Sequence, residues 1–288
     1  MTLRDELAAA LGERVGALEP VGGGSINEAW RAVLGDGTVV FVKAHADPPP
    51  GTFAAEAAGL GWLRGAPGAP AVPGVLGHAE GWLALEWVDV RPGGLDHAGE
   101  ERLGREVAAL HAAGAPAFGA TPGGAEPMRI GPLVLPNDPA GDWGAFYAER
   151  RLLPLVALAE DQDALPAGAA ARIERGAGRI EALAGPAEPP ARLHGDLWSG
   201  NVLAGPAGAP YVVDPAAHGG HREIDLAMLR LFGGPSARFH AAYSEAAPLA
   251  DGHAERVELW QLLPLLVHAV LFGGGYGARA DRAAARYA

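Results

Sequence analysis

The sequence predicts an α+β fold with two lobes, a small β-rich lobe over residues 1–88 and a larger, mainly helical lobe over residues 89–288. Between Ala17 and Glu86, short runs of β-branched and aromatic residues alternate with glycine-containing turns. After Arg91 the apolar residues recur with helical periodicity instead. We therefore expect a cleft between the lobes, which is a usual place for a small-molecule site.

The composition describes a folded chain with an acidic surface. The 288 residues are 49% hydrophobic and carry 22 Lys and Arg against 34 Asp and Glu, a formal net charge of −12. We expect no nucleic-acid or anionic-membrane partner, because neutralising phosphates requires clustered basic residues. The apolar stretch 259–272 is interrupted by polar residues and a proline, and it falls short of a membrane span. Without cysteines or an apolar signal-peptide core, the sequence predicts a cytoplasmic protein, which we expect to be a monomer.

The first lobe is expected to contain a sheet and one helix, preceded by an amphipathic helix at the N-terminus. Strands are expected at residues 17–21, 29–34, 38–43, 72–78 and 82–88. The Asp36-Gly37 pair lies between two of these runs and predicts a hairpin. The periodicity predicts a helix over 52–63, with Thr52 as its N-cap.

The second lobe is expected to be built from helices around a short strand-containing island. Helices are expected at residues 97–113, 143–159, 167–184, 222–232, 237–246 and 255–272. The island covers residues 192–203 and 210–214 and reads as strand, loop, strand. The most specific motif of the chain lies in it.

A glycine-rich turn follows the first strand of the sheet. It runs from Val21 to Asn27 and contains Gly23, Gly24 and Ser25. Successive backbone N–H groups in such a turn can surround a phosphate, and glycine lets the backbone approach it closely. A flexible hairpin turn is an equally good interpretation of the glycines alone.

Lys43, at the end of the third expected strand, is the only lysine among the 22 basic residues. A chain that otherwise uses arginine indicates a site here that needs a compact ammonium group. Glu56, thirteen residues on, lies in the expected helix on a face otherwise lined with alanines and could form an ion pair with Lys43. The alternatives are a lysine on a solvated strand and an exposed helix carboxylate.

Three polar residues of the island match a phosphotransfer site. Asp196 and Asn201 are five residues apart in the stretch from Leu193 to Leu203, and Asp214 ends the strand that follows. In such sites one carboxylate accepts a hydroxyl proton, while an amide and a second carboxylate hold magnesium between phosphate oxygens. Each of the three residues alone could have a structural role in a turn. All three occur in the order that a phosphotransfer site requires, after the glycine turn, Lys43 and Glu56, which favours the functional interpretation.

These motifs resemble a known family. The stretch 194–203 is similar to the HGDxxxxN loop of aminoglycoside-phosphotransferase-type, protein-kinase-like small-molecule kinases. Within that superfamily the chain most resembles the fructosamine kinase family, the ketosamine or protein-ribulosamine 3-kinases. The resemblance extends from about residue 5 to residue 277 and includes HGDLWSGN at 194–201, DPA at 214–216, GHREIDLAM at 220–228, GGGSINEAWR at 22–31 and LFGGGY at 271–276.

The resemblance implies a protein-kinase-like fold and an enzyme that uses ATP and Mg2+. It implies that Asp196 is the catalytic base and that Asn201 and Asp214 bind magnesium. It also implies that Lys43, oriented by Glu56, contacts the nucleotide phosphates.

The resemblance further implies how the nucleotide is held. The turn containing Gly23, Gly24 and Ser25 would cover it, and the backbone of a hinge formed by Glu86, Trp87 and Val88 would contact adenine. The DPA sequence and the lack of an activation loop imply a site that is assembled without regulation.

The family's substrate is a sugar joined through an amine to a protein lysine or a small amine, and it is phosphorylated on the 3-hydroxyl, which makes the adduct unstable. Trp198 is expected to form the floor for this sugar, since an aromatic face packs against C–H groups, although a core tryptophan is the alternative. Arg222 and Asp225 are expected to form a structural ion pair. His221 has no evident partner, and His268 is expected to be a satisfied core histidine.

Two other functions are compatible with parts of the sequence. A kinase for another small alcohol, such as an aminoglycoside or choline, would share Asp196, Asn201 and Asp214. A catalytically dead nucleotide-binding protein is disfavoured by the presence of all the kinase positions. Ser25, where the family commonly has an acidic residue, and the apolar 268–270 stretch are departures that bear on substrate preference.

Overall fold

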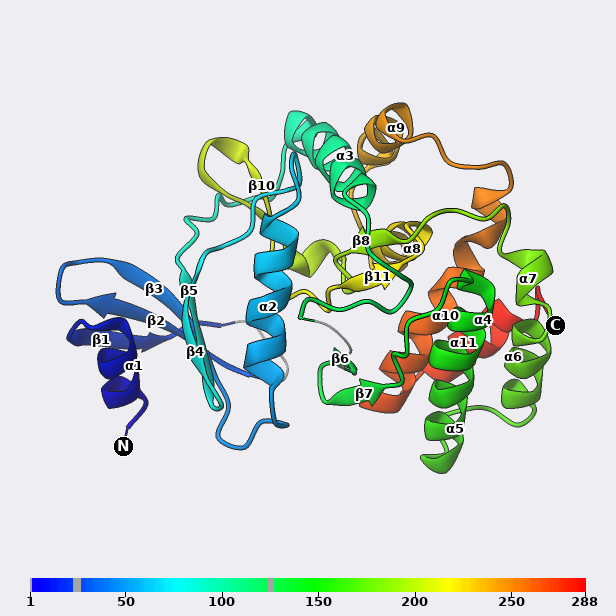
Figure 1. Ribbon diagram of the computed structural model, residues 1–288, viewed down its shortest axis with the longest axis horizontal. Helices are drawn as coiled ribbons and strands as arrows, with labels where there is room; N and C mark the ends of the chain where they lie inside the picture. The colour runs from blue at the N-terminus through cyan, green and yellow to red at the C-terminus, as the bar shows by residue number, and fades with distance from the viewer. Residues whose placement is uncertain (1, 23–26, 124–126) are drawn as a thin grey trace.

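The computed structural model describes residues 2–22, 27–123 and 127–288, and it divides into a sheet-based first part and a helical second part (Figure 1). The α+β class predicted from the sequence is confirmed. The exact lobe boundary after residue 88 stays a prediction.

The first part is a five-stranded antiparallel sheet in the order β1-β2-β3-β5-β4. Its elements are α1 (Leu3–Leu11), β1 (Val15–Pro20), β2 (Glu28–Leu34), β3 (Val39–Ala44), α2 (Thr52–Arg64), β4 (Val75–Ala79) and β5 (Trp82–Glu86). The expected hairpin joins β2 and β3, and the carboxylate of Asp36 accepts the backbone N–H of Thr38 at 2.8 Å. Helix α1 begins with a capping box between Thr2 and Asp5.

Helix α2 stands between the sheet and the helical part (Figure 1). The prediction that Thr52 caps it is wrong. The N-cap is Gly51, whose φ of 77° is left-handed, and the hydroxyl of Thr52 instead donates to the carbonyl of Pro49 at 2.6 Å. Because a left-handed N-cap disfavours residues with a Cβ, glycine takes that position and Thr52 becomes the first helical residue.

The second part packs helices around the 20-residue α10, which lies at the centre of a core containing Trp260, Tyr147 and Leu266. Its helices are α3 (His97–Ala112), α4 (Trp143–Tyr147), α5 (Leu153–Asp161), α6 (Ala169–Ala177), α7 (Ile180–Leu183), α8 (Glu223–Leu231), α9 (Ala237–Ala246), α10 (His253–Phe272) and α11 (Tyr276–Ala284). A π-helical turn, η1 (Ala148–Leu152), joins α4 to α5, and two 3-10 turns occur at Ser199–Asn201 (η2) and Pro206–Gly208 (η3).

Short antiparallel strand pairs hold the loops of the second part. They are β6 (Met128–Ile130) with β7 (Leu133–Leu135), β8 (Ala191–Leu193) with β11 (His218–Gly220), and β9 (Val202–Ala204) with β10 (Pro210–Val212). The expected strands of the island correspond to β8, β9 and β10. The two pairs that include them hold both ends of the loop 194–201, so that this loop has a fixed place between them.

Four features of the second part differ from the expectations. The helix expected at 143–159 is interrupted by the π-helical turn, and the helix expected at 167–184 is divided near Gly178. The β6–β7 hairpin and α11 were not predicted. A strand of three residues is too short to show a periodicity from which it could be predicted. The run of three glycines before α11 predicts the end of a helix and not the start of another.

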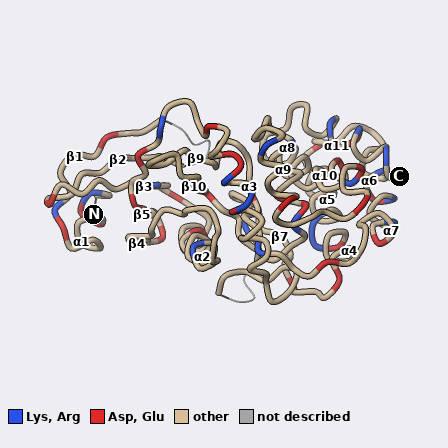
Figure 2. The backbone as a smooth tube through the Cα atoms, turned by 90° about the horizontal axis from the view of Figure 1, so that it is seen from above, with Lys and Arg blue, Asp and Glu red and all other residues tan. Residues whose placement is uncertain are grey.

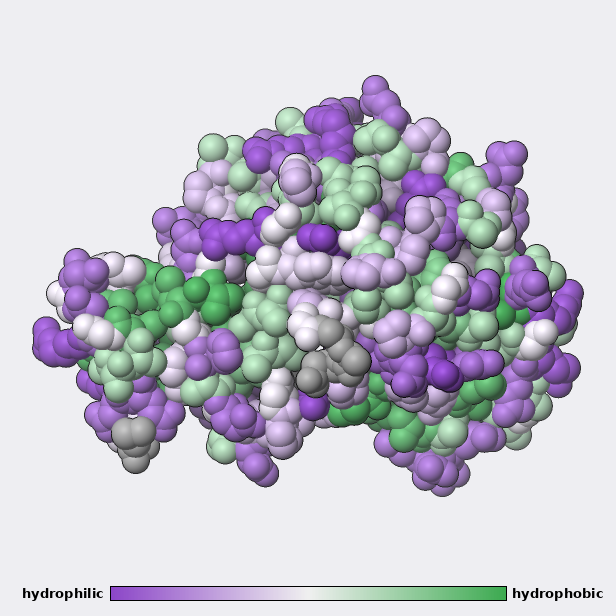
Figure 3. All heavy atoms as spheres, viewed as in Figure 1, coloured by the Kyte–Doolittle hydropathy of each residue, from purple (hydrophilic) through white to green (hydrophobic). Residues whose placement is uncertain are grey.

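The surface mixes charged and apolar residues. Acidic and basic residues are interspersed along both parts of the chain (Figure 2), and on the face shown in Figure 3 hydrophobic patches alternate with hydrophilic side chains. Within the described ranges, no helix is both long and apolar enough to cross a membrane.

His218 makes stability depend on pH. Its side chain is buried, its Nδ1–H donates to the carbonyl of Ala216 at 2.8 Å, and burial lowers its pKa from 6.5 to about 4. Because the folded state holds the neutral ring, His218 contributes stability above pH 6.5 that is lost as pH falls toward 4, about 3 kcal/mol. We expect the free energy of unfolding of His218→Gln, measured by urea titration, to fall less over this pH interval than that of the wild type. The exposed His97→Gln variant is the control and should follow the wild type; equal slopes for all three proteins would contradict the prediction.

Candidate active site

One cavity of about 1650 Å3 extends between the sheet and the helical part. Apolar residues of the sheet, among them Phe41 and Leu85, line one half. Residues of the helical part, among them Ile224 and Leu263, line the other half. The polar residues singled out from the sequence lie where the halves meet.

The ammonium group of Lys43 lies between two carboxylates. Its Nζ is 2.7 Å from Oε1 of Glu56 and 2.5 Å from Oδ1 of Asp214. Lys43 is only 7% exposed, so the solvated-strand alternative is wrong. The side chain of Glu56 is 12% exposed, so the alternative of an exposed helix carboxylate is wrong as well. Burial alone lowers the pKa of Lys43, but the charges of Glu56 and Asp214 outweigh it and leave the pKa raised.

Asp214 follows β10 and has a φ of 58°. Aspartate tolerates this left-handed conformation better than bulkier residues do. The conformation and the bond to Lys43 place its carboxylate at the cavity, where 44% of the side chain is exposed. Strained backbone of this kind is common at functional sites.

Asp196 and Asn201 face each other across the loop 194–201. The side-chain amide of Asn201 donates to the backbone carbonyl of Asp196 at 2.9 Å and to its carboxylate at 3.1 Å. Burial raises the pKa of Asp196 to about 6. The hydrogen bond from Asn201 lowers this pKa, whereas the nearby charges of Asp214 and Asp225 raise it further. The geometry therefore places a carboxylate with an elevated proton affinity at the junction of the two halves.

The carboxylate of Asp225 holds the backbone of the loop 194–201. It accepts the N–H groups of His194 at 2.8 Å and Gly195 at 3.0 Å. Gly195 has a φ of 83°, and an added Cβ would clash with the carbonyl of Ala216, so only glycine fits. Asp225 also contacts Nε2 of His111 at 3.2 Å, and its pKa is lowered by these hydrogen bonds although burial opposes them.

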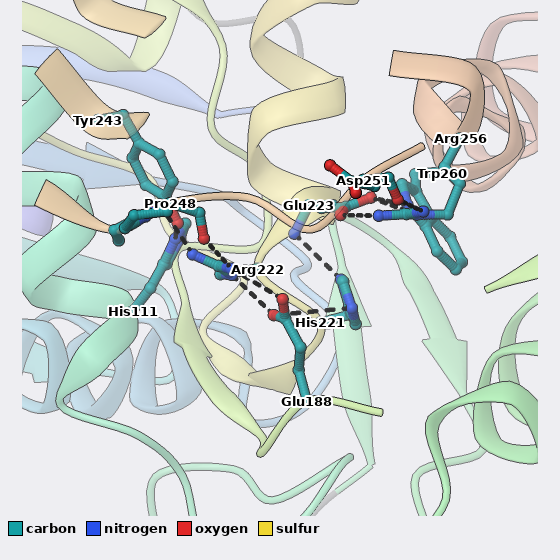
Figure 4. A network of polar contacts seen from close by, with 11 residues as sticks. His111, Glu188, His221, Arg222, Glu223, Tyr243, Pro248, Asp251, Arg256 and Trp260 are labelled. Carbon is teal, nitrogen blue, oxygen red and sulfur yellow. Dashed lines mark hydrogen bonds and ion pairs between the residues drawn. The ribbon is translucent and has the colours of Figure 1, made fainter. Parts of the chain in front are cut away.

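The expected ion pair between Arg222 and Asp225 is wrong. Arg222 instead forms a two-pronged pair with Glu188, both bonds being 2.7 Å, and donates to the carbonyls of Ala247 and Pro248 (Figure 4). Arg222 lies at the start of α8 and faces the loop before β8, whereas Asp225 is turned toward the loop 194–201. His221, for which no partner was expected, lies 3.8 Å from Glu188.

A second buried pair extends this network toward α10. Glu223 accepts two hydrogen bonds from Arg256, at 3.0 and 2.6 Å, and one from Nε1 of Trp260 at 2.7 Å (Figure 4). Arg256 also donates to the carbonyl of Asp251 at 3.0 Å. The network thus ties the start of α8, which carries Asp225, to α10.

Trp198 lies at the cavity rather than in the core. It is 37% exposed, so the core-tryptophan alternative is wrong, and it packs edge-on against Phe232 with ring centres 6.1 Å apart. His268 is satisfied by donating Nδ1–H to the carbonyl of Pro264 at 2.7 Å, but its ring lines the cavity beside Phe232 and Tyr276. These rings form an aromatic wall of the helical half.

The structure describes only some of the residues that are expected to hold a nucleotide. Glu86, Trp87 and Val88 line the cavity at the end of β5. Gly23, Gly24 and Ser25 lie outside the described residues. Sequence reasoning missed the supporting residues His111, Glu188 and Arg256. For His111 and Arg256 the only available signal was a polar residue on a largely apolar helix face, and Glu188, in the loop before β8, offered no such signal.

The cavity also offers oxygen donors that suit magnesium. The Asn201 amide nitrogen is engaged by Asp196, which leaves its oxygen available, and Asp214 presents a partly exposed carboxylate. Among the described residues no group of three His, Cys, Asp or Glu could hold a metal ion. Two protein oxygen donors fit magnesium, because this ion is usually bound by one or two such ligands together with water and substrate phosphates.

Comparisons with known proteins assign the family. The model of the fructosamine kinase family matches residues 2–287. A probable ketoamine kinase of Thermus thermophilus is 39% identical over 269 residues, which cover 92% of this chain and 91% of the relative. The chloroplastic protein-ribulosamine 3-kinase of Arabidopsis thaliana is 34% identical over 270 residues, covering 90% of this chain and 79% of the relative.

Solved structures agree with the assignment. A candidate fructosamine-3-kinase from Thermobifida fusca is 46% identical with a TM-score of 0.89, covering 99% of each chain. The macrolide 2'-phosphotransferase of Brachybacterium faecium, 20% identical with a TM-score of 0.60 over 98% of this chain and 95% of its own, shares the fold alone. The kinase-like phosphotransferase fold expected from the motifs is thereby confirmed.

The buried network generates a prediction about stability. Arg256→Met leaves the carboxylate of Glu223 buried without its cation, so we expect a loss of about 3–5 kcal/mol of unfolding free energy. The matched control is Arg238→Met, which removes an exposed pair with Glu101 and should cost less than about 1 kcal/mol. Urea titration measures both, and similar small losses in the two variants would contradict the structural role of the Arg256–Glu223 pair.

Proposed function

The chain belongs to the fructosamine kinase family, and from this premise we propose that it transfers the γ-phosphoryl group of ATP to the 3-hydroxyl of a ketosamine. The observation that carries the proposal is the convergence of Lys43, Asp196, Asn201 and Asp214 on one cavity between the two parts.

Asp196 is the proposed catalytic base. It lines the cavity beside Trp198, and its elevated pKa suits a group that receives a proton during the reaction. The hydroxyl oxygen of the sugar attacks the γ-phosphorus, its proton passes to the Asp196 carboxylate, and ADP leaves as the bond to the γ-phosphorus breaks. The bond from Asn201 keeps the carboxylate oriented toward the cavity.

Lys43 is proposed to contact the phosphates of ATP. Glu56 holds the ammonium in place from α2, and the raised pKa keeps it charged. The residues Glu86, Trp87 and Val88 at the end of β5 are proposed to contact adenine, and the turn with Gly23, Gly24 and Ser25 to cover the nucleotide. Most of the rate then comes from positioning and charge neutralisation, as is general for phosphoryl transfer.

Asn201 and Asp214 are proposed to hold magnesium. The ion would neutralise charge on the phosphates. Lys43 shares Asp214 with this proposed site, so the same carboxylate is oriented by the lysine that contacts the phosphates.

The acceptor is proposed to be a ribulosamine or fructosamine adduct of a protein lysine or a small amine. Relatives named as ketoamine kinase and protein-ribulosamine 3-kinase support this class, and the aromatic face of Trp198 suits the C–H groups of a sugar. The resulting 3-phosphate would destabilise the adduct and release the amine. The monomeric state and the cytoplasmic location stay predictions from the sequence.

Replacing the base tests the proposal directly. We expect Asp196→Asn to abolish phosphorylation of ribulosyl-lysine and fructosyl-lysine, because an amide cannot take the hydroxyl proton, while calorimetry still shows ATP binding. The exposed Asp163→Asn variant is the control and should retain wild-type turnover. Full activity of Asp196→Asn, or phosphorylation of choline or an aminoglycoside in place of the two ketosamines, would overturn the assignment.

The single lysine provides a second test. We expect Lys43→Arg to lose roughly a hundredfold or more in kcat/KM, because the planar guanidinium does not replace a compact ammonium between two carboxylates. The reverse exchange at an exposed position, Arg14→Lys, should leave the kinetics unchanged. Wild-type kinetics of Lys43→Arg would show that the ammonium has no role at the phosphates.

A further inference from the structure

The β6–β7 hairpin forms part of the cavity wall on the helical side. Met128 and Leu135 are buried in the same core as Leu263 and Val267 of α10. Met128, Leu263 and Val267 also line the cavity. The hairpin therefore lies on the helical half of the cavity, which also carries Asp196 and Trp198, the residues proposed to meet the acceptor sugar.

The hairpin brings an arginine to this wall. Residues of a strand alternate between its faces, and Met128 and Ile130 pack on the core, so Arg129 between them points away from the core. Arg129 lines the cavity and is partly buried there. Within the described ranges, the Arg129 side chain makes neither a hydrogen bond nor an ion pair.

Most of the other charged side chains of the cavity are in ion pairs or have a role in the proposed reaction. Among the described lining residues, the charged side chains besides Arg129 are Lys43, Glu56, Glu86, Asp196 and Asp214. Lys43 is held by two carboxylates, and Glu86 lies 3.7 Å from Arg64. Arg129 is thus a cation with unused donors in a fork that matches a carboxylate.

The base of the hairpin is fixed by a buried arginine. Arg151, in the π-helical turn, is fully buried and donates to the carbonyl of Pro136 and to Oδ1 of Asn137, each at 2.7 Å. The side-chain amide of Asn137 in turn donates to the carbonyl of Gly119. The two ends of the segment 119–137 are thereby joined, so the hairpin presents Arg129 from a fixed base, which lowers the ordering cost of binding.

We propose that Arg129 binds the carboxylate of a glycated free amino acid, which makes such small adducts preferred over protein-bound lysine. This rests on the proposed function, because the sugar 3-hydroxyl must meet Asp196 and the amine-bearing part must then occupy the rest of the acceptor half. A protein-bound lysine has no carboxylate at this position, since its α-carboxyl group is an amide. The carboxylate of the small adduct would accept hydrogen bonds from the guanidinium of Arg129.

Two substrates that differ in a single group test the proposal. They are Nε-ribulosyl-lysine and its carboxamide, in which the carboxylate is replaced by a neutral amide. For the wild type we expect the free acid to have the lower KM. Arg129→Gln should raise KM for the free acid by roughly ten- to a hundredfold and leave KM for the carboxamide, kcat and KM for ATP unchanged. Arg129→Lys should retain part of the preference.

The control is Arg175→Gln, an exposed arginine of α6 away from the cavity, which should behave as the wild type. An equal effect of Arg129→Gln on both substrates would overturn the proposal. A raised KM for ATP would also overturn it, since Arg129 would then contact the nucleotide phosphates.

Binding measured by calorimetry separates this proposal from the proposed function. If the wild type phosphorylated neither compound but bound the free acid more tightly than the carboxamide, and Arg129→Gln removed that difference, the kinase assignment would fail and the carboxylate site would stand. If the wild type phosphorylated both compounds and bound them equally, the carboxylate site would fail and the kinase assignment would stand.

Discussion

The ammonium group of Lys43 lies where three segments of the fold meet. It comes from β3, Glu56 comes from α2, and Asp214 follows β10 in the second part of the chain. Burying one charge without a partner is costly, but two carboxylates within hydrogen-bond distance offset that cost. The sheet, α2 and the Asp214 segment must therefore keep their relative positions for the charges to balance, and this requirement sets the shape of the cavity.

Asp225 imposes a comparable constraint from the other side. Two backbone N–H groups at the start of the loop 194–201 are accepted by the Asp225 carboxylate, which is itself 0% exposed. His111 orients that carboxylate, and the pairs of Arg222 with Glu188 and Arg256 with Glu223 fix the helix that carries it. The backbone that carries the proposed base is thus placed by groups that do not line the cavity.

The sequence was sufficient for the order of the lobes and for residues whose chemistry is unusual in their surroundings. A lone lysine, an Asp-Gly hairpin and the HGDLWSGN loop are signals that do not depend on tertiary contacts. The partner of Arg222 could not be predicted, because Glu188 is 34 residues away and only the folded chain brings them together. The same reason applies to the N-cap of α2: a threonine before an apolar run predicts a cap, yet the left-handed Gly51 is set by the loop that precedes the helix. Arg129 was passed over because its three-residue strand has no pattern of its own.

The scarcity of lysine has a consequence for the protein's own chemical durability. Reducing sugars condense with unprotonated amines, and lysine supplies most such amines on ordinary proteins. Here the only lysine side chain is buried and held as an ammonium ion by two carboxylates, so it is a poor nucleophile. The arginines that replace lysine elsewhere carry no amine of this kind. An enzyme proposed to remove sugar adducts thus offers almost no side-chain site at which the same adducts could accumulate on itself.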